Sequence, residues 1–302
     1  MSSKQLWITV WLSLACASGR AAQTNWQAEV KAAGIYSDNL KVKELEQASG
    51  ESDQGWQHSA MGAVQWQTDQ QQLNFTSLLQ QQRWQQSPEF DTRLWIHSLD
   101  WSSAVADWRA GLMMNYADAS LDGSDFLQLY QSGLYLARLW PSGWYQRTSW
   151  QWSQKQFAEL AGRDARQHQL RWEQFWFSSD SSQIVQIAGF YQWERADQPS
   201  FSYQGPALEL SWALKTMQQK QQWKVKAGYQ WRDYQAPWSE QEPQQRRDQQ
   251  SYLGLSMDWT LWRSLAVQSS LEQQWVRSTT NSLDYRQLQL QLGLSYKFSG
   301  LQ

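Results

Sequence analysis

Apolar and polar residues alternate along most of the chain. In the stretch 286–298, RQLQLQLGLSYKF, every second position from Leu288 to Phe298 is leucine or aromatic. The positions between them carry glutamine, glycine, serine and lysine. Strict alternation of this kind predicts a β-strand with one apolar face and one polar face. The same pattern recurs through the chain, so we expect an all-β protein.

Alternating segments of about ten residues or more, separated by turn-like residues, are typical of a transmembrane antiparallel up-and-down β-barrel. We expect fourteen strands, at 25–37, 54–68, 71–83, 91–103, 105–117, 125–139, 144–157, 165–177, 183–195, 201–214, 222–234, 250–262, 264–277 and 283–298. Three of these segments alternate less regularly (71–83, 91–103 and 125–139), which leaves twelve or sixteen strands as alternatives.

The connections between these strands alternate in length. The longer ones follow odd-numbered strands: 38–53, 118–124, 158–164 and 235–249. Outer-membrane barrels have short periplasmic turns and longer outer loops, so we expect both termini in the periplasm. The apolar face of each strand then contacts lipid, and the protein needs no internal hydrophobic core. After residue 22 no apolar run is long enough for a transmembrane helix.

Tryptophan is abundant, with 23 residues among 302. Amphipathic rings favour the two membrane–water interfaces, and membrane barrels concentrate them there. The alternative is that tryptophan packs the core of a soluble β-protein, but then the polar strand faces would carry less glutamine. The predicted interface aromatics are Trp26, Trp56, Trp66, Trp140, Trp144, Trp193, Trp223, Trp231, Trp259, Trp262 and Phe298.

The N-terminus has the features of an export signal. Lys4 precedes the apolar run LWITVWLSLACA, and small residues follow. We expect a signal peptide at 1–22, cleaved between 17 and 22, and a single barrel domain at 23–302. The one cysteine, Cys16, makes lipidation an alternative. The formal net charge of −2 gives no reason to expect nucleic-acid binding.

The polar strand faces would line the barrel lumen. They carry charges of both signs among many glutamines, which donate and accept hydrogen bonds without charge. Such a lumen suits hydrated neutral or zwitterionic solutes. The candidate selectivity residues are Lys31, Arg109, Arg147, Arg171, Glu173, Glu209, Lys224, Lys226, Arg232, Asp258 and Glu272.

Lys224, Lys226 and Arg232 form a basic stripe on one expected strand. The stripe could act on solutes, but we favour a solvated wall that pairs with carboxylates of neighbouring strands.

Nothing in the sequence predicts an enzyme, a cofactor or a metal. The three histidines, His58, His97 and His168, are scattered and have no partners at a catalytic or zinc-binding spacing. Asp38-Asn39 with Glu51-Ser52-Asp53 offers oxygen ligands for calcium in the first loop. The spacing is not that of a known calcium loop, so a solvated turn is the better interpretation.

Two short motifs carry a resemblance to known families. The ending LGLSYKF resembles the last strand of Gram-negative outer-membrane proteins. This resemblance implies that the barrel-insertion machinery recognises the strand through Phe298. In those proteins the aromatic residue ends the strand signal, whereas here four further residues, SGLQ, follow Phe298. The segment VKAAGIYSDNL resembles the first strand and loop of the barrel of surface lipoprotein assembly modifiers. In size the chain is similar to OmpG-type monomeric porins.

We therefore expect a monomeric integral outer-membrane barrel that contacts outer-membrane lipids. An interior wider than that of an eight-stranded barrel favours a passive channel for small polar solutes. One alternative is a barrel that exports or assembles a surface polysaccharide or lipoprotein with periplasmic partners. A second alternative is a structural barrel with a closed lumen.

Overall fold

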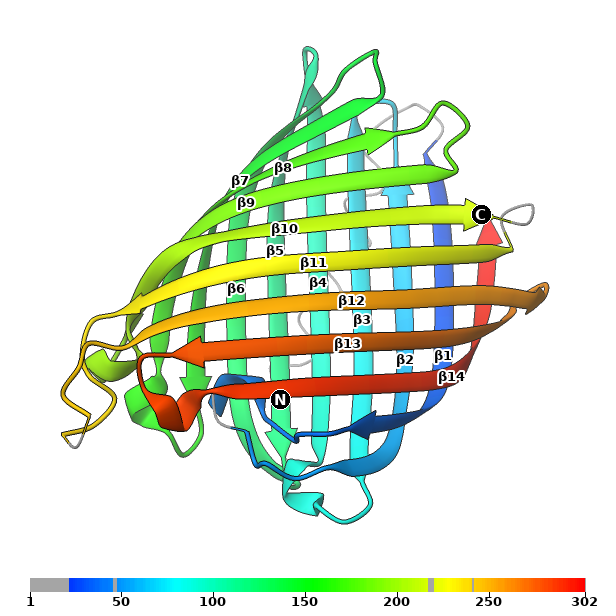
Figure 1. Ribbon diagram of the computed structural model, residues 1–302. Coiled ribbons are helices and arrows are strands. Elements are labelled where there is room, and N and C mark those ends of the chain that lie inside the picture. Colours follow the sequence, from blue (N-terminus) through cyan, green and yellow to red (C-terminus); the bar gives the residue numbers. More distant parts are fainter. Residues whose placement is uncertain (1–21, 46–47, 217–219, 241, 302) are drawn as a thin grey trace, which may run out of the picture.

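A computed structural model describes residues 22–45, 48–216, 220–240 and 242–301. The predicted signal peptide lies outside the described residues except for its last position. The described residues form fourteen strands (Figure 1). They are β1 (Gln23–Ser37), β2 (Asp53–Gln67), β3 (Gln71–Trp84), β4 (Thr92–Val105), β5 (Trp108–Leu121), β6 (Ser124–Leu139), β7 (Trp144–Phe157), β8 (Ala165–Phe177), β9 (Gln183–Ala196), β10 (Tyr203–Thr216), β11 (Gln221–Tyr234), β12 (Arg247–Trp262), β13 (Leu265–Ser278) and β14 (Tyr285–Leu301).

The strands close into one antiparallel barrel. Each strand pairs with its neighbours in the chain, and β14 pairs with β1 to complete the ring. This seam runs from Asn25 opposite Leu301 to Ser37 opposite Gln289. Closure leaves no strand edge unpaired, as lipid requires. The predicted fold class and the strand number of fourteen are confirmed. None of the helices in the described part of the chain is long and apolar enough to span a membrane.

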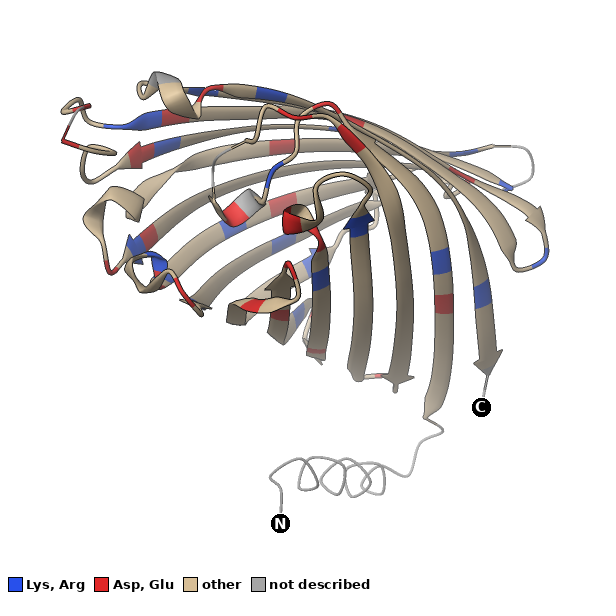
Figure 2. Ribbon diagram, turned by 90° about the horizontal axis from the view of Figure 1, so that it is seen from below, with Lys and Arg blue, Asp and Glu red and all other residues tan. Residues whose placement is uncertain are grey.

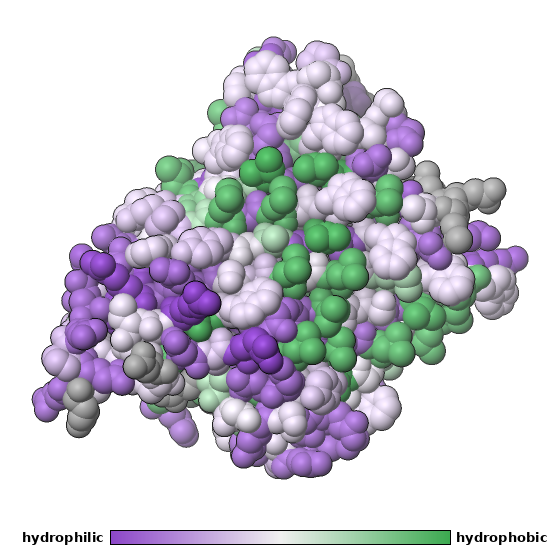
Figure 3. Space-filling model, viewed as in Figure 1, coloured by the Kyte–Doolittle hydropathy of each residue, from purple (hydrophilic) through white to green (hydrophobic). Residues whose placement is uncertain are grey.

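The outer face of the barrel is apolar. Leucine, valine and aromatic side chains project outward from every strand, and Leu292 and Trp262 are 64% and 67% exposed. These side chains gather in a belt across the strands, with hydrophilic surface beyond it at both ends (Figure 3). An apolar surface that encircles the molecule is far larger than soluble monomers expose. The barrel is therefore a transmembrane one.

The two ends of the barrel differ. One end, at the upper right of Figure 1, has short turns together with the start of β1 and the end of β14; we call it the turn end. In its β8–β9 turn, hydrogen bonds from Ser178 and Ser182 lower the pKa of Asp180 to about 2. The other, the loop end, has all five described 3₁₀ turns: η3 (Lys43–Leu45), η4 (Pro88–Phe90), η5 (Ala161–Arg163), η6 (Pro199–Phe201) and η7 (Asn281–Leu283).

One predicted loop is wrong. The connection expected at 118–124 consists only of Asp122 and Gly123, because β5 and β6 extend into the expected loop. Both residues have positive φ, 49° and 75°. An Asp-Gly pair between alternating strands is a strong signal for such a two-residue hairpin turn.

Four loops at the loop end are closed by the same type of hydrogen bond. A polar side chain just before a strand accepts the backbone N–H of the last residue of the previous strand. The pairs are Trp84 with Asp91, Phe157 with Asp164, Ala196 with Ser202, and Ser278 with Asp284, at 2.7, 2.7, 2.8 and 2.5 Å. Each bond satisfies a donor that has no strand partner. Each of these four hydrogen bonds therefore fixes one loop to the rim of the barrel at the loop end.

Candidate functional site

Hydrogen bonds between strands that are not neighbours identify the inner face. Tyr135 on β6 donates to Asp100 on β4 at 2.9 Å. Arg171 on β8 donates to Glu209 on β10 at 2.6 Å. A side chain can bridge over an intervening strand only on the concave side of a closed sheet. These residues also alternate along their strands with the outward apolar ones, so the polar faces line the interior.

All eleven predicted lumen residues occupy inner positions of their strands. Each alternates with exposed or outward-facing residues of the apolar belt. They are Lys31 on β1, Arg109 on β5, Arg147 on β7, Arg171 and Glu173 on β8, Glu209 on β10, Lys224, Lys226 and Arg232 on β11, Asp258 on β12 and Glu272 on β13. Figure 2 shows basic and acidic positions on neighbouring strands of the wall.

Four of these residues form one continuous ion-pair network across β7, β8 and β10. Arg147 donates to Glu173 at 2.6 Å. Arg171 lies 3.2 Å from Glu173 and 2.6 Å from Glu209. Gln186 on β9 donates to Glu173 at 3.2 Å. The network holds two positive and two negative charges, so it adds little net charge to the lumen while covering one side of the wall.

Lys224 and Lys226 differ from that network. Their strand partners are Ser211, Ala213, Gly254 and Ser256, which are small and uncharged. Among the described residues neither lysine has a carboxylate within 4.0 Å. The interpretation of a wall paired with neighbouring carboxylates is therefore wrong for these two lysines. Arg232, the third member of the stripe, packs over the Tyr203 ring, 4.5 Å from its centre.

Two tyrosines lie flat against the inner wall over glycines. A Cβ atom on Gly111 would fall 2.1 Å from Cζ of Tyr135, and one on Gly228 would fall 2.2 Å from Cε1 of Tyr252. The glycines leave room for rings that would otherwise project into the lumen. Sequence reasoning missed both pairs because nothing local to a glycine shows which side chain covers it.

The β1–β2 loop enters the mouth at the loop end. We call its described residues, 38–45 and 48–52, the mouth strap. Asn39 donates to the Arg286 carbonyl oxygen at 2.9 Å, and Lys41 donates to the Tyr285 hydroxyl at 3.0 Å. Leu40 is only 1% exposed. One end of the strap is thus fixed to the start of β14, on the inner side of the barrel.

The middle of the strap reaches the far side of the mouth. Arg163, in the β7–β8 loop, donates to the carbonyl oxygens of Glu44 at 2.6 Å and of Leu45 at 3.2 Å. Its guanidinium packs 4.0 Å from the Phe201 ring centre. The β1–β2 and β7–β8 connections lie six strands apart in a ring of fourteen, so the strap crosses the mouth. The first loop therefore narrows the mouth of the barrel.

The loop end is also narrowed by buried side chains beside the strap. Arg246 and Asp248 form a buried ion pair, and the Arg246 guanidinium lies 3.8 Å from the Tyr234 ring centre. Leu283 of η7 is 1% exposed. The interior is therefore packed near the loop end on the side of β11 to β14.

The predicted interface aromatics all belong to the outer surface or the turns. Eight are exposed: Trp26, Trp56, Trp140, Trp144, Trp193, Trp259, Trp262 and Phe298. The other three face outward but are half-buried: Trp66, Trp223 and Trp231. Their place at a membrane interface stays a prediction. Another exposed tryptophan, Trp95, was missed because its strand alternates irregularly and its face was uncertain.

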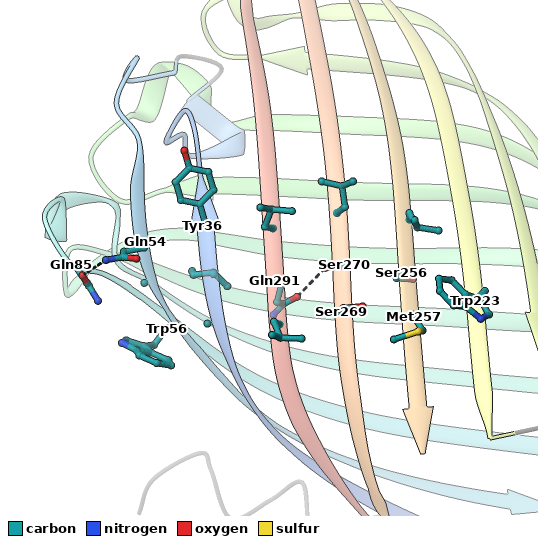
Figure 4. Close-up of a pocket in the computed structure, with 17 residues that line it drawn as sticks. Tyr36, Gln54, Trp56, Gln85, Trp223, Ser256, Met257, Ser269, Ser270 and Gln291 are labelled. Atoms are coloured by element: carbon teal, nitrogen blue, oxygen red, sulfur yellow. Dashed lines mark hydrogen bonds between the residues drawn. The ribbon is translucent and has the colours of Figure 1, made fainter. Parts of the chain in front are cut away.

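A groove of about 700 Å³ lies on the outer face, over the seam and β11 to β13 (Figure 4). Apolar side chains such as Trp56, Trp223 and Met257 line it, with a hydrogen bond between Gln54 and Gln85 at its rim. Its lining contains no Asp, Glu, His, Cys, Lys or Arg side chain, so we regard it as part of the apolar belt.

The predicted calcium-binding alternative in the first loop is not supported. Asp53 accepts the backbone N–H groups of Gln86 and Ser87, and Asp38 accepts that of Leu288. These carboxylates therefore hold loops and strands together. In the described part of the chain, no group of three or more His, Cys, Asp or Glu side chains could hold a metal ion.

No family model and no curated protein matches the chain. Solved structures do match in fold. The outer membrane channel DcaP of Acinetobacter baumannii aligns with a TM-score of 0.58 at 8% identity, over 93% of this chain and 99% of that one. OmpT, an outer membrane protein of Vibrio cholerae, gives 0.54 at 6% identity, over 93% and 99%. An anion-selective porin from Comamonas acidovorans gives 0.51 at 10% identity, over 92% and 100%.

At these identities the likeness concerns the fold alone: this chain has the barrel fold of outer-membrane porins and channels. The matches do not confirm the closer resemblance to OmpG-type porins or to the barrel of surface lipoprotein assembly modifiers.

Proposed function

We propose that the protein is a passive outer-membrane channel for small polar solutes. The observation that carries this proposal is the inner wall: a closed transmembrane barrel whose interior is lined by glutamine and by charges of both signs. Such a wall offers water-like hydrogen bonding along the whole length of the strands. The fold likeness to outer-membrane channels supports the same conclusion.

The mouth strap gives this channel its constriction. Because it crosses the mouth between β14 and the β7–β8 loop, solutes must pass beside it. Channels of this kind select by pore width and by the groups that line the narrow part. The ion-pair network contributes polarity without net charge. Lys224 and Lys226 give the wall of β11 a local preference for anionic or zwitterionic groups.

The proposed location is the outer membrane, with both termini in the periplasm and the strap on the outside. In this orientation the short turns face the periplasm. The C-terminal strand, with Phe298 in its apolar face, is the proposed recognition element for the barrel-insertion machinery. β14 continues past Phe298 to Leu301, so that machinery would bind a strand whose last aromatic residue is not terminal. We propose a monomer without cofactor or enzymatic activity.

Single-channel recording in a planar bilayer tests the function. We expect discrete conductance steps from the purified, heat-modifiable barrel, and larger steps from a variant in which residues 40–49 are replaced by a short Gly-Ser linker. A folded wild-type barrel without steps, together with a folded linker variant without steps, would reject the channel.

A further inference from the structure

Six arginines stand on the outer face of the barrel at its loop end. All six are exposed, and each lies within the first or last two residues of its strand. Among the described residues none of them has a carboxylate within 4.0 Å, whereas the neighbouring Arg247 pairs with Asp233 at 3.3 Å. The six are Arg83 on β3, Arg93 on β4, Arg166 on β8, Arg195 on β9, Arg277 on β13 and Arg286 on β14.

The six arginines come in three pairs on adjacent strands. Arg166 lies directly opposite Arg195 in the β8–β9 register. In the other pairs the two arginines are diagonal neighbours: Arg93 is opposite Gln81, and Arg286 is opposite Trp275. Like charges directly opposite each other destabilise a sheet. Arg83 contacts the amide of Gln81, which does not neutralise it. Each pair therefore leaves a doubly positive patch that an anion would stabilise.

Each pair lies at the edge of the apolar belt. On three strands a tryptophan occupies the next outward position toward the belt: Trp95 after Arg93, Trp193 before Arg195, and Trp275 before Arg277. These rings are 50%, 41% and 38% exposed. At the turn end the arrangement differs, because Arg138 pairs with Asp107 at 3.0 Å and packs over Trp140.

We propose that the three arginine pairs bind the phosphate groups of phosphorylated lipid headgroups in the leaflet at the loop end. The guanidinium group matches phosphate in a bidentate geometry. A free anion would contact only the arginine side chains. A phosphorylated lipid would place its phosphates at the arginines and its acyl chains against the apolar belt. The proposal rests on the outer-membrane location proposed above, and it predicts that this leaflet carries the more anionic headgroups.

The test is a binding titration with the full barrel folded in a zwitterionic detergent. The probes are bisphosphorylated lipid A, the same lipid without its phosphates, and inorganic phosphate. We expect wild type to bind the bisphosphorylated lipid preferentially. An arginine near an anionic lipid surface contributes about five-fold to binding. R166Q/R195Q should therefore weaken binding at its own pair by about twenty-five-fold, and the barrel should bind about one third less lipid at concentrations that fill the two remaining pairs. R138Q/R263Q removes two arginines at the turn end and should bind as wild type does.

Three results would overturn the proposal: equal binding of the phosphate-free lipid, equal weakening in R138Q/R263Q, or competition by inorganic phosphate as strong as that by the lipid. The single variant R195Q keeps the test decisive if the double variant folds poorly. Without lipid A it should be at least as heat-stable as wild type, because it removes a like-charge contact, and with lipid A it should gain less stability. Channel conductance is recorded separately, so failure of lipid binding and failure of the channel remain distinguishable.

Discussion

Replacing Arg163 by alanine should release the mouth strap. The guanidinium makes two charge-assisted hydrogen bonds to strap carbonyl oxygens, at 2.6 and 3.2 Å. Bonds of this type contribute about 1.5–3 kcal/mol each when buried. Arg163 is half-buried, so we take about 2 kcal/mol for both after allowing for solvent screening. That free energy raises the detached fraction of the strap about thirty-fold.

Thiol labelling measures this fraction without relying on conduction. The sequence has one cysteine, Cys16, inside the predicted signal peptide. A cysteine introduced for Val42, which is 7% exposed in the strap, should react slowly with a small polar thiol reagent. In the R163A background we expect its reaction to be about thirty-fold faster. In a planar bilayer the same variant should flicker to a higher conductance.

The matched control is Arg166→Ala, three residues away on the outer face of β8, where it makes no contact with the strap. It should change neither the labelling rate nor the conductance. If R163A labels at the wild-type rate in a barrel of unchanged heat stability, the hydrogen bonds to Arg163 do not hold the strap, and the constriction has another cause.

Three further perturbations test the two faces of the wall. Leu292→Arg places a charge in the middle of the apolar belt and should lower the free energy of unfolding in lipid vesicles by about 2–4 kcal/mol. Gln289→Arg, on the inner face of the same strand, should change the free energy of unfolding little. Equal losses in the two variants would mean that the faces are misassigned. Lys224→Gln with Lys226→Gln should shift the reversal potential in a salt gradient toward cation preference, and no shift would show that the solute path avoids β11. Gly111→Val should displace the Tyr135 ring into the lumen and lower the conductance by adding a second narrow part to the one beside the strap. An unchanged conductance in a folded variant would show that this ring does not enter the solute path.

The alternation of single residues was sufficient to predict the strands. β14 could be located because its leucines and glutamines alternate without interruption, and the faces of all eleven lumen residues followed from the same parity. The β5–β6 turn was missed although its signal, Asp122-Gly123, is in the sequence; the polar residues around it suggested a longer loop. The position of three outer arginines at the edge of the belt could also have been predicted from the sequence. Arg93, Arg195 and Arg277 each lie two positions from a tryptophan, on the same face of the strand.

The strap could not be predicted in the same way. Arg163 binds the backbone carbonyl groups of Glu44 and Leu45, and a carbonyl acceptor leaves no trace in the side-chain pattern. The two loops are also far apart in the chain, and only the closed ring brings them to opposite sides of one mouth. For Lys224 and Lys226, the missing carboxylates depended on the register of β10 to β12, which alternation alone does not define.

The seam between β1 and β14 determines when the strap gains its anchor on β14. Its two strands are separated by the whole length of the domain, so this pairing has the largest sequence separation in the fold and is costly to form early. Gly293 lies so close to β1 that a Cβ atom there would meet the Ala32 carbonyl oxygen at 2.5 Å. The strap is attached to residues at the β14 side of this seam. A chain that has not yet joined its first and last strands therefore lacks the β14 anchor of the strap, so the strap is held on both sides of the mouth only after the last step of barrel closure.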